Sequence, residues 1–146
     1  MRADKSTYDF IRSPLMEGEK LVAYQDSTPA KIWTIGAGAT TVNNVPVKKG
    51  DRITQAQSEQ IFYKEAVRFE NDVNENSTRE LTRQEWNVLF SIAWNHGTGW
   101  YTDKRLIVIQ FNKDPKDFKE IERILNMMDN HNRRMNELRY LKTGKL

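Results

Sequence analysis

Two acidic residues near the amino terminus, Glu17 and Asp26, have the types and spacing to do chemistry. Cleavage of a glycosidic bond needs one protonated carboxylic acid to protonate the leaving oxygen. It also needs one ionised carboxylate to activate water or stabilise positive charge at the anomeric carbon. We expect Glu17 to lie toward the end of a helix, beside Leu15 and Trp33, where a half-apolar setting raises the pKa of its carboxyl group. Asp26 lies at a polar turn and should stay ionised. Spacing alone does not make the pair catalytic, because such pairs of surface carboxylates are common.

Other kinds of catalytic site find little support in the sequence. There is no cysteine, so neither a thiolate nucleophile nor a disulfide can form. His96 and His131 are the two histidines, and no HExxH or similar pair of metal ligands is present. The run Gly36-Ala37-Gly38 lacks the third glycine and the following helix of a dinucleotide-binding loop. We therefore expect no metal and no cofactor.

The composition is that of an ordinary globular protein, and its 146 residues suffice for one domain. The formal net charge is +3, and residues 130–146 alone carry five basic residues against one acidic residue. This basic segment either attracts a polyanion, such as nucleic acid or an anionic cell envelope, or is a solvated helix face. We expect no nucleic-acid partner, because the sequence has no recognition helix and no interleaving of aromatic and basic residues.

The amino terminus shows no sign of a secretory signal, because residues 1–7 are polar and no apolar run follows them. No apolar segment approaches the roughly 20 residues that span a bilayer. We therefore expect no transmembrane segment. If the substrate lies outside the cytoplasm, another component must deliver the protein.

The elements that position the carboxylates follow from local patterns. A helix is predicted within residues 6–22, with Ser13-Pro14 as a candidate start and Pro14 able to divide it. Period-two alternation then predicts a small hairpin or three-stranded ribbon, in which Gly36 and Gly38 permit unusual backbone angles. Its parts are an extended segment over 22–26, a turn over 27–29, a strand over 32–37 and a loop or irregular strand over 42–52.

The remainder is predicted to be helical. Capping boxes at Thr54 and Thr82 begin a long linking helix and a central core helix, and Gly97 follows the central helix as a C-cap. Later helices are predicted over 106–111, 115–128 and 135–143, the last ended by Gly144. The predicted class is α+β, in a single monomeric domain of residues 1–146. Its parts are a β-containing lobe at about 20–53, a linking helix at about 54–74 and a helical lobe at about 80–146, on which the N-terminal helix packs.

The combined motifs closely resemble the phage-type lysozyme (endolysin) family, glycoside hydrolase family 24, whose pattern is EG, LxAYxD and WTIGxGHT. The matching residues are Glu17-Gly18, Leu21-x-Ala23-Tyr24-x-Asp26 and Trp33-Thr34-Ile35-Gly36-x-Gly38-x-Thr40. The resemblance covers most of the chain, since Asn132-Arg133-Arg134-x-x-Glu137 is similar to the family's late NRR-x-x-E segment. It implies a lysozyme-like fold with a β-hairpin lobe and a larger helical lobe joined by a long helix.

The resemblance also implies a muramidase that hydrolyses the β-1,4 bond between N-acetylmuramic acid and N-acetylglucosamine in peptidoglycan. Glu17 would be the general acid, while Asp26 and Thr34 would hold and activate the attacking water, with inversion at the anomeric carbon. Arg133 would pair with the Glu17 carboxylate in the free enzyme. Trp94, Asn95 and Thr40 are candidates to bind substrate; alternatively, Trp94 belongs to the core and Asn95 caps its helix.

The sequence departs from the family pattern at three places. Ala39 replaces the usual histidine after Gly-x-Gly, from which we expect weaker support of the hairpin. Seven residues separate Asp26 from Thr34 where the family usually has five, and an even-numbered insertion preserves side-chain facing because strands have period two. Lys104-Arg105 replaces small hydroxyl residues near the cleft and can alter which envelope polymers bind.

The leading hypothesis is a bacteriolytic phage or prophage enzyme, held in the host cytoplasm until a separate holin releases it to the periplasm or cell wall. A second hypothesis is a lytic transglycosylase, which needs only the acid. A third, from another class, is a lysozyme-like glycan-binding or regulatory module whose altered hairpin no longer catalyses.

Overall fold

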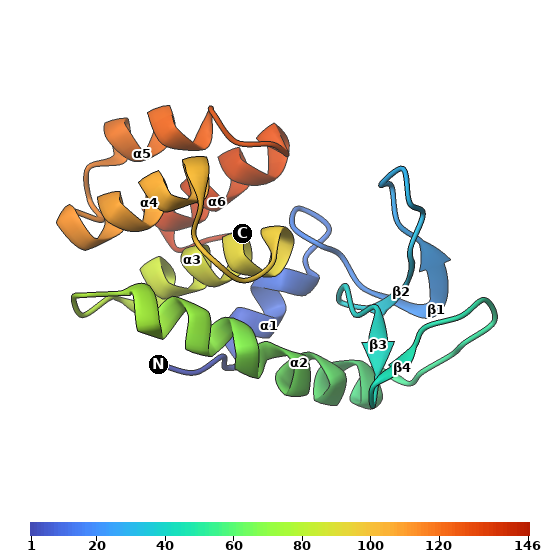
Figure 1. Ribbon diagram of the computed structural model, residues 1–146. Coiled ribbons are helices and arrows are strands. Elements are labelled where there is room, and N and C mark those ends of the chain that lie inside the picture. The colour runs from blue at the N-terminus through green and yellow to red at the C-terminus, as the bar shows by residue number, and fades with distance from the viewer. The chain divides into compact units, whose positions relative to one another are not determined.

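The computed structural model describes residues 1–146 and has the predicted α+β class (Figure 1). Its tertiary contacts divide into two compact units: residues 4–67, the N-terminal unit, and residues 1–3 with 68–146, the helical unit. The elements in chain order are α1 (Lys5–Arg12), β1 (Lys20–Gln25), β2 (Trp33–Gly36), β3 (Thr41–Val42), β4 (Val45–Pro46), α2 (Gln55–Asn76), α3 (Arg83–His96), α4 (Thr102–Lys113), α5 (Phe118–Leu125) and α6 (His131–Thr143).

The first helix, α1, is shorter than predicted. It begins with a capping box in which Asp4 and Thr7 exchange hydrogen bonds, and it ends at Arg12. Ser13 is its C-cap, with ψ of 139°, because the residue before a proline is driven out of the helical region. The prediction that a helix starts at Ser13-Pro14 is therefore wrong. Residues 14–17 form turns, and Glu17 follows the helix at a distance of five residues instead of ending it.

Strands β1 and β2 form an antiparallel ribbon in which Tyr24 lies opposite Thr34 and Gln25 lies opposite Trp33. The pairing extends one residue beyond the strands, since the Asp26 amide donates to the Ile32 carbonyl at 2.9 Å. A second small hairpin, β3–β4, occupies part of the predicted loop over 42–52. Its turn residues Asn43 and Asn44 both have positive φ, as a two-residue type I′ turn requires.

The core of the N-terminal unit forms where α1 meets the first half of α2. The Tyr8 ring lies 5.3 Å from the Phe62 ring between centroids, and Ile11 and Ile35 are buried. Strand β2 approaches α2 closely at Gly36, where a Cβ atom would come within 3.0 Å of the Ser58 hydroxyl. Helix α2 begins at the predicted capping box, with reciprocal hydrogen bonds of 2.8 and 3.1 Å between Thr54 and Gln57.

The helical unit is built around α3, as its pattern predicts. Thr82 and Glu85 form the predicted capping box, and Gly97 caps the other end with φ of 88°. In this unit α3 contacts α4 and α6, and α5 contacts α4 and α6 (Figure 1). Three aromatic rings at successive turns of α3 stack on one another, and the last of them, Trp94, also contacts Phe69 of α2. These are Trp86, Phe90 and Trp94, with centroid separations of 5.3 and 5.7 Å.

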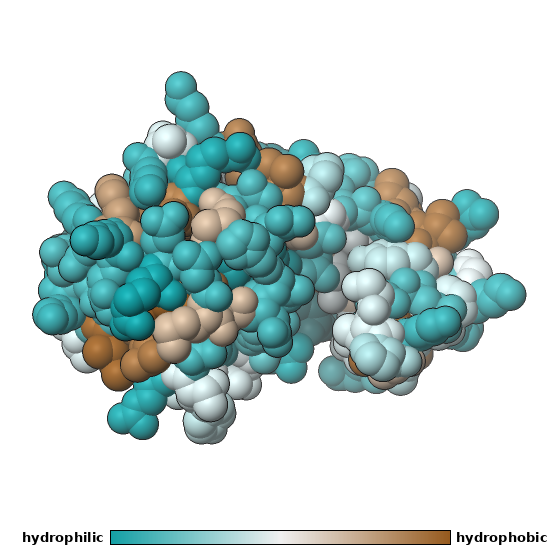
Figure 2. Space-filling model, turned by 90° about the horizontal axis from the view of Figure 1, so that it is seen from above, coloured by the Kyte–Doolittle hydropathy of each residue, from teal (hydrophilic) through white to brown (hydrophobic).

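The later helices differ from prediction at their ends. Helix α4 extends beyond the predicted 106–111 in both directions, and α5 covers only the middle of the predicted 115–128. Helix α6 ends at Gly144, which has φ of 70°, as predicted. The face of the molecule shown in Figure 2 is mostly hydrophilic, with its apolar residues in separate small groups. No helix in the structure has both the length and the apolar character needed to cross a membrane.

Candidate functional site

Glu17 lies in the turn that joins α1 to β1. Its amide donates to the Ile11 carbonyl at 3.1 Å, and the next amide, of Gly18, donates to the Ser13 carbonyl at 3.0 Å. The Glu17 side chain is half-buried. Leu15, which we expected to supply part of an apolar setting, is 41% exposed and does not enclose it. The chain here is held by backbone hydrogen bonds to the end of α1.

Asp26 lies at the end of the β1–β2 ribbon and holds the turn that follows. Its Oδ1 atom accepts hydrogen bonds from the Thr28 hydroxyl at 2.6 Å, the Ile32 amide at 3.0 Å and the Thr28 amide at 3.2 Å. The Thr28 hydroxyl and these backbone amides lower the pKa of Asp26 against the smaller opposing effect of burial. Asp26 is therefore a carboxylate that stays ionised, and its Oδ2 atom takes part in none of these bonds.

Thr34 lies on the same face of the ribbon as Asp26. Because Tyr24 is opposite Thr34 and strand side chains alternate, Tyr24 and Asp26 share that face and Thr34 is a diagonal neighbour of Asp26. The Thr34 side chain is 3% exposed, and its hydroxyl donates to the Ile32 carbonyl at 3.0 Å. The extra residues lie in the turn, which the Lys31 amide closes onto the Thr28 carbonyl at 3.0 Å. The longer turn thus leaves the pairing of Asp26 with Ile32 intact.

The charges of both carboxylates, Glu17 and Asp26, act on the side chain of Tyr24. Burial raises the pKa of the Tyr24 hydroxyl, and the negative charges of Glu17 and Asp26 raise it further. Both carboxylates therefore lie close enough to Tyr24 to act on its phenol. Glu17, Asp26 and Thr34 all belong to the N-terminal unit, and Thr34 lies opposite this tyrosine in the ribbon. Tyr24 was part of the motif but was not predicted as a site residue.

Two other positions in the hairpin bear on the site. Ala39, which replaces the family histidine, exchanges two backbone hydrogen bonds with Ile35, at 2.8 and 2.9 Å. The hairpin end therefore keeps backbone support without a side-chain donor. Thr40 is exposed, and its carbonyl accepts from the Val47 amide at 3.0 Å. Its predicted contact with substrate stays a prediction.

The sequence did not predict a group of hydrogen-bond donors around the carboxylate of Glu19, two residues after Glu17. Glu19 accepts hydrogen bonds from Tyr8, Gln55, Ser58 and Arg12. We call Glu19 and these four donors the Glu19 cluster. These partners come from α1 and α2, at positions up to 39 residues away in the chain. The nearest sequence signal is the pair Tyr8 and Arg12, four residues apart on α1, and it does not point to Glu19.

Arg133, predicted to pair with Glu17, belongs to the helical unit. Its side chain is buried, and its Nη2 atom donates to the Ser91 carbonyl at 3.2 Å and to the Ser91 hydroxyl at 3.1 Å. Its Nε atom lies 3.4 Å from Oε1 of Glu137. The predicted pairing with Glu17 would join the two compact units and stays a prediction.

Trp94 and Asn95 have contacts within the helical unit that favour a structural role. The half-buried Trp94 ring packs on Phe69, with centroids 5.0 Å apart. The Asn95 Oδ1 atom accepts from the Asn130 side chain at 2.9 Å, at the start of α6. Gly97, and not Asn95, is the C-cap of α3. Substrate contacts by either residue stay predictions.

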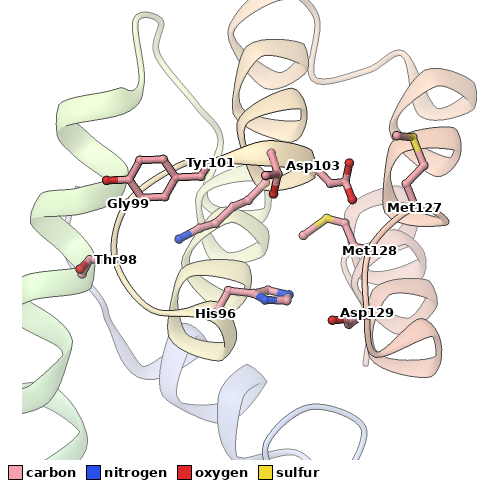
Figure 3. A pocket seen from close by; sticks show the side chains of 10 residues that line it. His96, Thr98, Gly99, Tyr101, Asp103, Met127, Met128 and Asp129 are labelled. Carbon is pink, nitrogen blue, oxygen red and sulfur yellow. The ribbon is translucent and has the colours of Figure 1, made fainter.

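The helical unit also contains a pocket of about 280 Å³ between the end of α3, the start of α4 and the α5–α6 connection (Figure 3). His96, Asp103 and Met128 are among its lining residues. Lys104, expected near the cleft, is buried: its amine donates to the Gly97 carbonyl and lies 3.9 Å from Asp72. Burial lowers the pKa of Lys104, and the Asp72 charge opposes this. No group of three or more histidine or acidic side chains could hold a metal ion.

Comparison with known proteins gives consistent results. A model of the family described as phage lysozyme matches residues 15–140. A SAR-endolysin of Escherichia phage N15 is 47% identical over 84 residues, which are 57% of this chain and 46% of that relative. The chain thus matches about half the length of this curated relative.

Solved structures also match nearly the whole chain. The endolysin from Escherichia coli O157:H7 phage FAHEc1 has 26% identity and a TM-score of 0.82, covering 99% of this chain and 96% of that one. P22 lysozyme has 21% identity and a TM-score of 0.72, covering 98% of this chain and 99% of that one. The second likeness shows the fold alone.

Proposed function

The chain belongs to the phage lysozyme family, and on that premise we propose that it is a lytic glycoside hydrolase acting on bacterial peptidoglycan. The bond cleaved is the β-1,4 bond between N-acetylmuramic acid and N-acetylglucosamine. The observation that carries the proposal is the register of the β1–β2 ribbon, which puts Asp26 and Thr34 on one face. Glu17 is the second carboxylate whose charge acts on Tyr24, the residue opposite Thr34.

The proposed reaction assigns one role to each side chain. Glu17 gives its proton to the leaving oxygen as the glycosidic bond breaks. Water attacks the anomeric carbon and passes a proton to Asp26, whose Oδ2 atom takes no part in the hydrogen bonds of the turn. The Thr34 hydroxyl donates its own hydrogen to the Ile32 carbonyl, so its oxygen is left to accept a hydrogen bond from the water. Direct attack by water inverts the anomeric configuration.

Release of new reducing ends from purified peptidoglycan tests this proposal. The wild-type chain should release them, and Glu17→Gln should lower the rate by roughly 100- to 10,000-fold, the range of general acid catalysis. Glu59→Gln, a change at a partly exposed position on α2, is the matched control and should keep wild-type activity. A folded wild-type protein that binds glycan strands but releases no product contradicts the proposal and favours a binding or regulatory module.

The same digests separate hydrolysis from lytic transglycosylation. Mass spectra of the fragments should show reducing ends and not 1,6-anhydro ends, because the site has a second carboxylate to activate water. Asp26→Asn should lose most activity. Anhydro products, together with retained activity in Asp26→Asn, would favour the transglycosylase.

The proposed route to peptidoglycan differs from the holin-dependent release predicted from the sequence. The phage N15 relative is named a SAR-endolysin, a name that denotes signal-anchor release. This name favours release to the periplasm without a holin for the full-length protein. Expression of the complete gene product in Escherichia coli without a holin should then cause lysis; lysis that requires a co-expressed holin would restore the original prediction.

A further inference from the structure

The Glu19 cluster is a densely bonded group around one carboxylate. The Glu19 side chain is 12% exposed. It accepts from the Tyr8 hydroxyl, from the Ser58 hydroxyl at 2.8 Å and from the Gln55 amide at 2.9 Å, and the Arg12 guanidinium lies 3.4 Å away. Burial alone would raise the pKa of Glu19, but these hydrogen bonds and the Arg12 charge lower it. The carboxylate is therefore fixed in its charged form between α1 and α2.

Glu17 lies between two fixed points of the chain. On its amino-terminal side, the Glu17 and Gly18 amides bond to the carbonyls of Ile11 and Ser13. On its carboxyl-terminal side, Gly18 has φ of 77°, and no atom lies within 4 Å of the position that a Cβ would take. Open space lies where a Gly18 side chain would be, so the next side chain that fixes the chain is that of Glu19.

The same cluster reaches the strands that carry the other proposed catalytic groups. Strand β1, which leads to Asp26, begins at the residue after Glu19. Ser58, which donates to Glu19, also lies against Gly36 at the end of β2, two residues after Thr34. Movement of the Glu19 carboxylate would therefore shift the turn and both strands relative to one another.

We propose that Glu19 is a positioning residue, which fixes the Glu17 carboxyl group relative to Asp26 and Thr34. This inference rests on the proposed function. A general acid must lie within hydrogen-bond reach of the leaving oxygen, and a displacement of about 1 Å can cost roughly 100-fold in rate. Glu19 touches no reacting atom in this role and acts through Glu17.

Steady-state kinetics on soluble, uncrosslinked glycan strands tests the proposal. Glu19→Gln keeps the shape of the side chain but removes its charge and one acceptor atom. We expect kcat to fall by roughly 10- to 100-fold while KM changes less than about three-fold, since the displaced group acts in the bond-breaking step. Tyr8→Phe, which removes one donor from the cluster, should cause a smaller fall of the same kind. Glu59→Gln should match the wild type.

The outcomes separate this inference from the proposed function. An inactive wild-type protein contradicts the proposed function itself. An active wild type, an inactive Glu17→Gln variant and a Glu19→Gln variant with kcat within about two-fold of the wild type would overturn the positioning role alone, even if the variant melts earlier. If Glu19→Gln does not fold, Tyr8→Phe decides: a lower kcat at unchanged KM supports the role, and an unchanged kcat overturns it.

Discussion

Each compact unit contains a largely or fully buried carboxylate with arginine nearby, but the two carboxylates are hydrogen-bonded differently. In the N-terminal unit both oxygens of Glu19 accept hydrogen bonds. In the helical unit Glu137 is fully buried, and its Oε1 atom accepts from the Ser91 hydroxyl and from Arg134, each at 2.7 Å. Its Oε2 atom has no partner, and neither have the Nε and Nη1 atoms of the buried Arg134.

This contrast shows two uses of buried charge. The Glu19 cluster surrounds one carboxylate with neutral donors and a partly exposed arginine, so the desolvation of its charge is largely compensated. The Glu137 cluster, made of Ser91, Arg133, Arg134 and Glu137, buries two guanidinium groups against one carboxylate. Burial lowers the pKa of Arg134, while Glu137 opposes the change. The Glu19 cluster is suited to holding one carboxylate in a precise position. The Glu137 cluster is stable only while every one of its members is present.

Removal of the Glu137 carboxylate should have the largest effect. Glu137→Leu leaves the Arg134 charge buried without its partner, so we expect a loss of about 3–5 kcal/mol in the free energy of unfolding. Urea denaturation followed by tryptophan fluorescence measures it. The double variant Arg134→Met with Glu137→Leu should regain part of that stability, because the Arg134 charge is removed while the buried Arg133 keeps its hydrogen bonds to Ser91. Equal losses in the single and double variants would mean that the charges are not coupled.

Acid should destabilise the protein through Glu19 by a smaller amount. The folded pKa of Glu19 is below its usual 4.5, so its contribution is complete above about pH 4.5 and is lost as pH falls through the folded value. We expect the wild type to lose stability as pH falls below about 4.5, and this loss should be absent in Glu19→Gln. Urea midpoints of both proteins across this range provide the measurement, and parallel curves would show that Glu19 does not titrate as described.

Alkali should act on the same cluster through Tyr8. Burial and the bond to Glu19 raise the pKa of Tyr8 from 10.0 to about 12. Stability from the neutral phenol is therefore complete below pH 10 and is lost as pH rises toward 12. Tyr8→Phe should lose less stability over this interval than the wild type. Absorbance of the phenolate in the wild type and in Tyr8→Phe assigns the transition, because the tyrosine that titrates near pH 12 should be missing from the variant.

The smallest expected effect concerns Asp26, whose bonds are at an exposed turn. Thr28→Ala removes the hydroxyl that most lowers the pKa of Asp26, so that pKa should rise. Because Asp26 must be ionised to accept a proton, the acid limb of the kcat/KM profile should move to higher pH by less than about one pH unit. Thr28→Ser retains the hydroxyl and should follow the wild type. A shift toward lower pH would exclude Asp26 as the titrating base.

The elements best predicted from the sequence are those fixed by neighbouring residues. The capping box at Thr82 and the glycine after α3 define that helix locally, and the structure confirms both. The first helix was extended too far because Ser13-Pro14 can either begin or end a helix. In the structure Ser13 leaves the helical region, and the amides of Glu17 and Gly18 bond back to the end of α1.

The candidate site shows the same division. Glu17, Asp26 and Thr34 came from the resemblance to a family, since their spacing alone carries little information. The alternation of side chains along strands predicts that Asp26 and Thr34 share a face, provided that the two strands pair. Glu19 could not be foreseen, because Gln55 and Ser58, which bond to it, lie 36 and 39 residues away in the chain.

The charges of Glu17 and Asp26 both act on the Tyr24 phenol, which makes that phenol a probe of the two carboxylates. Its pKa is raised by burial and then by the charges of Glu17 and Asp26. Neutralising either carboxylate should therefore make Tyr24 ionise more easily. Optical titrations of Glu17→Gln and Asp26→Asn, compared with the wild type and with no glycan present, thus measure how strongly each carboxylate acts on this phenol.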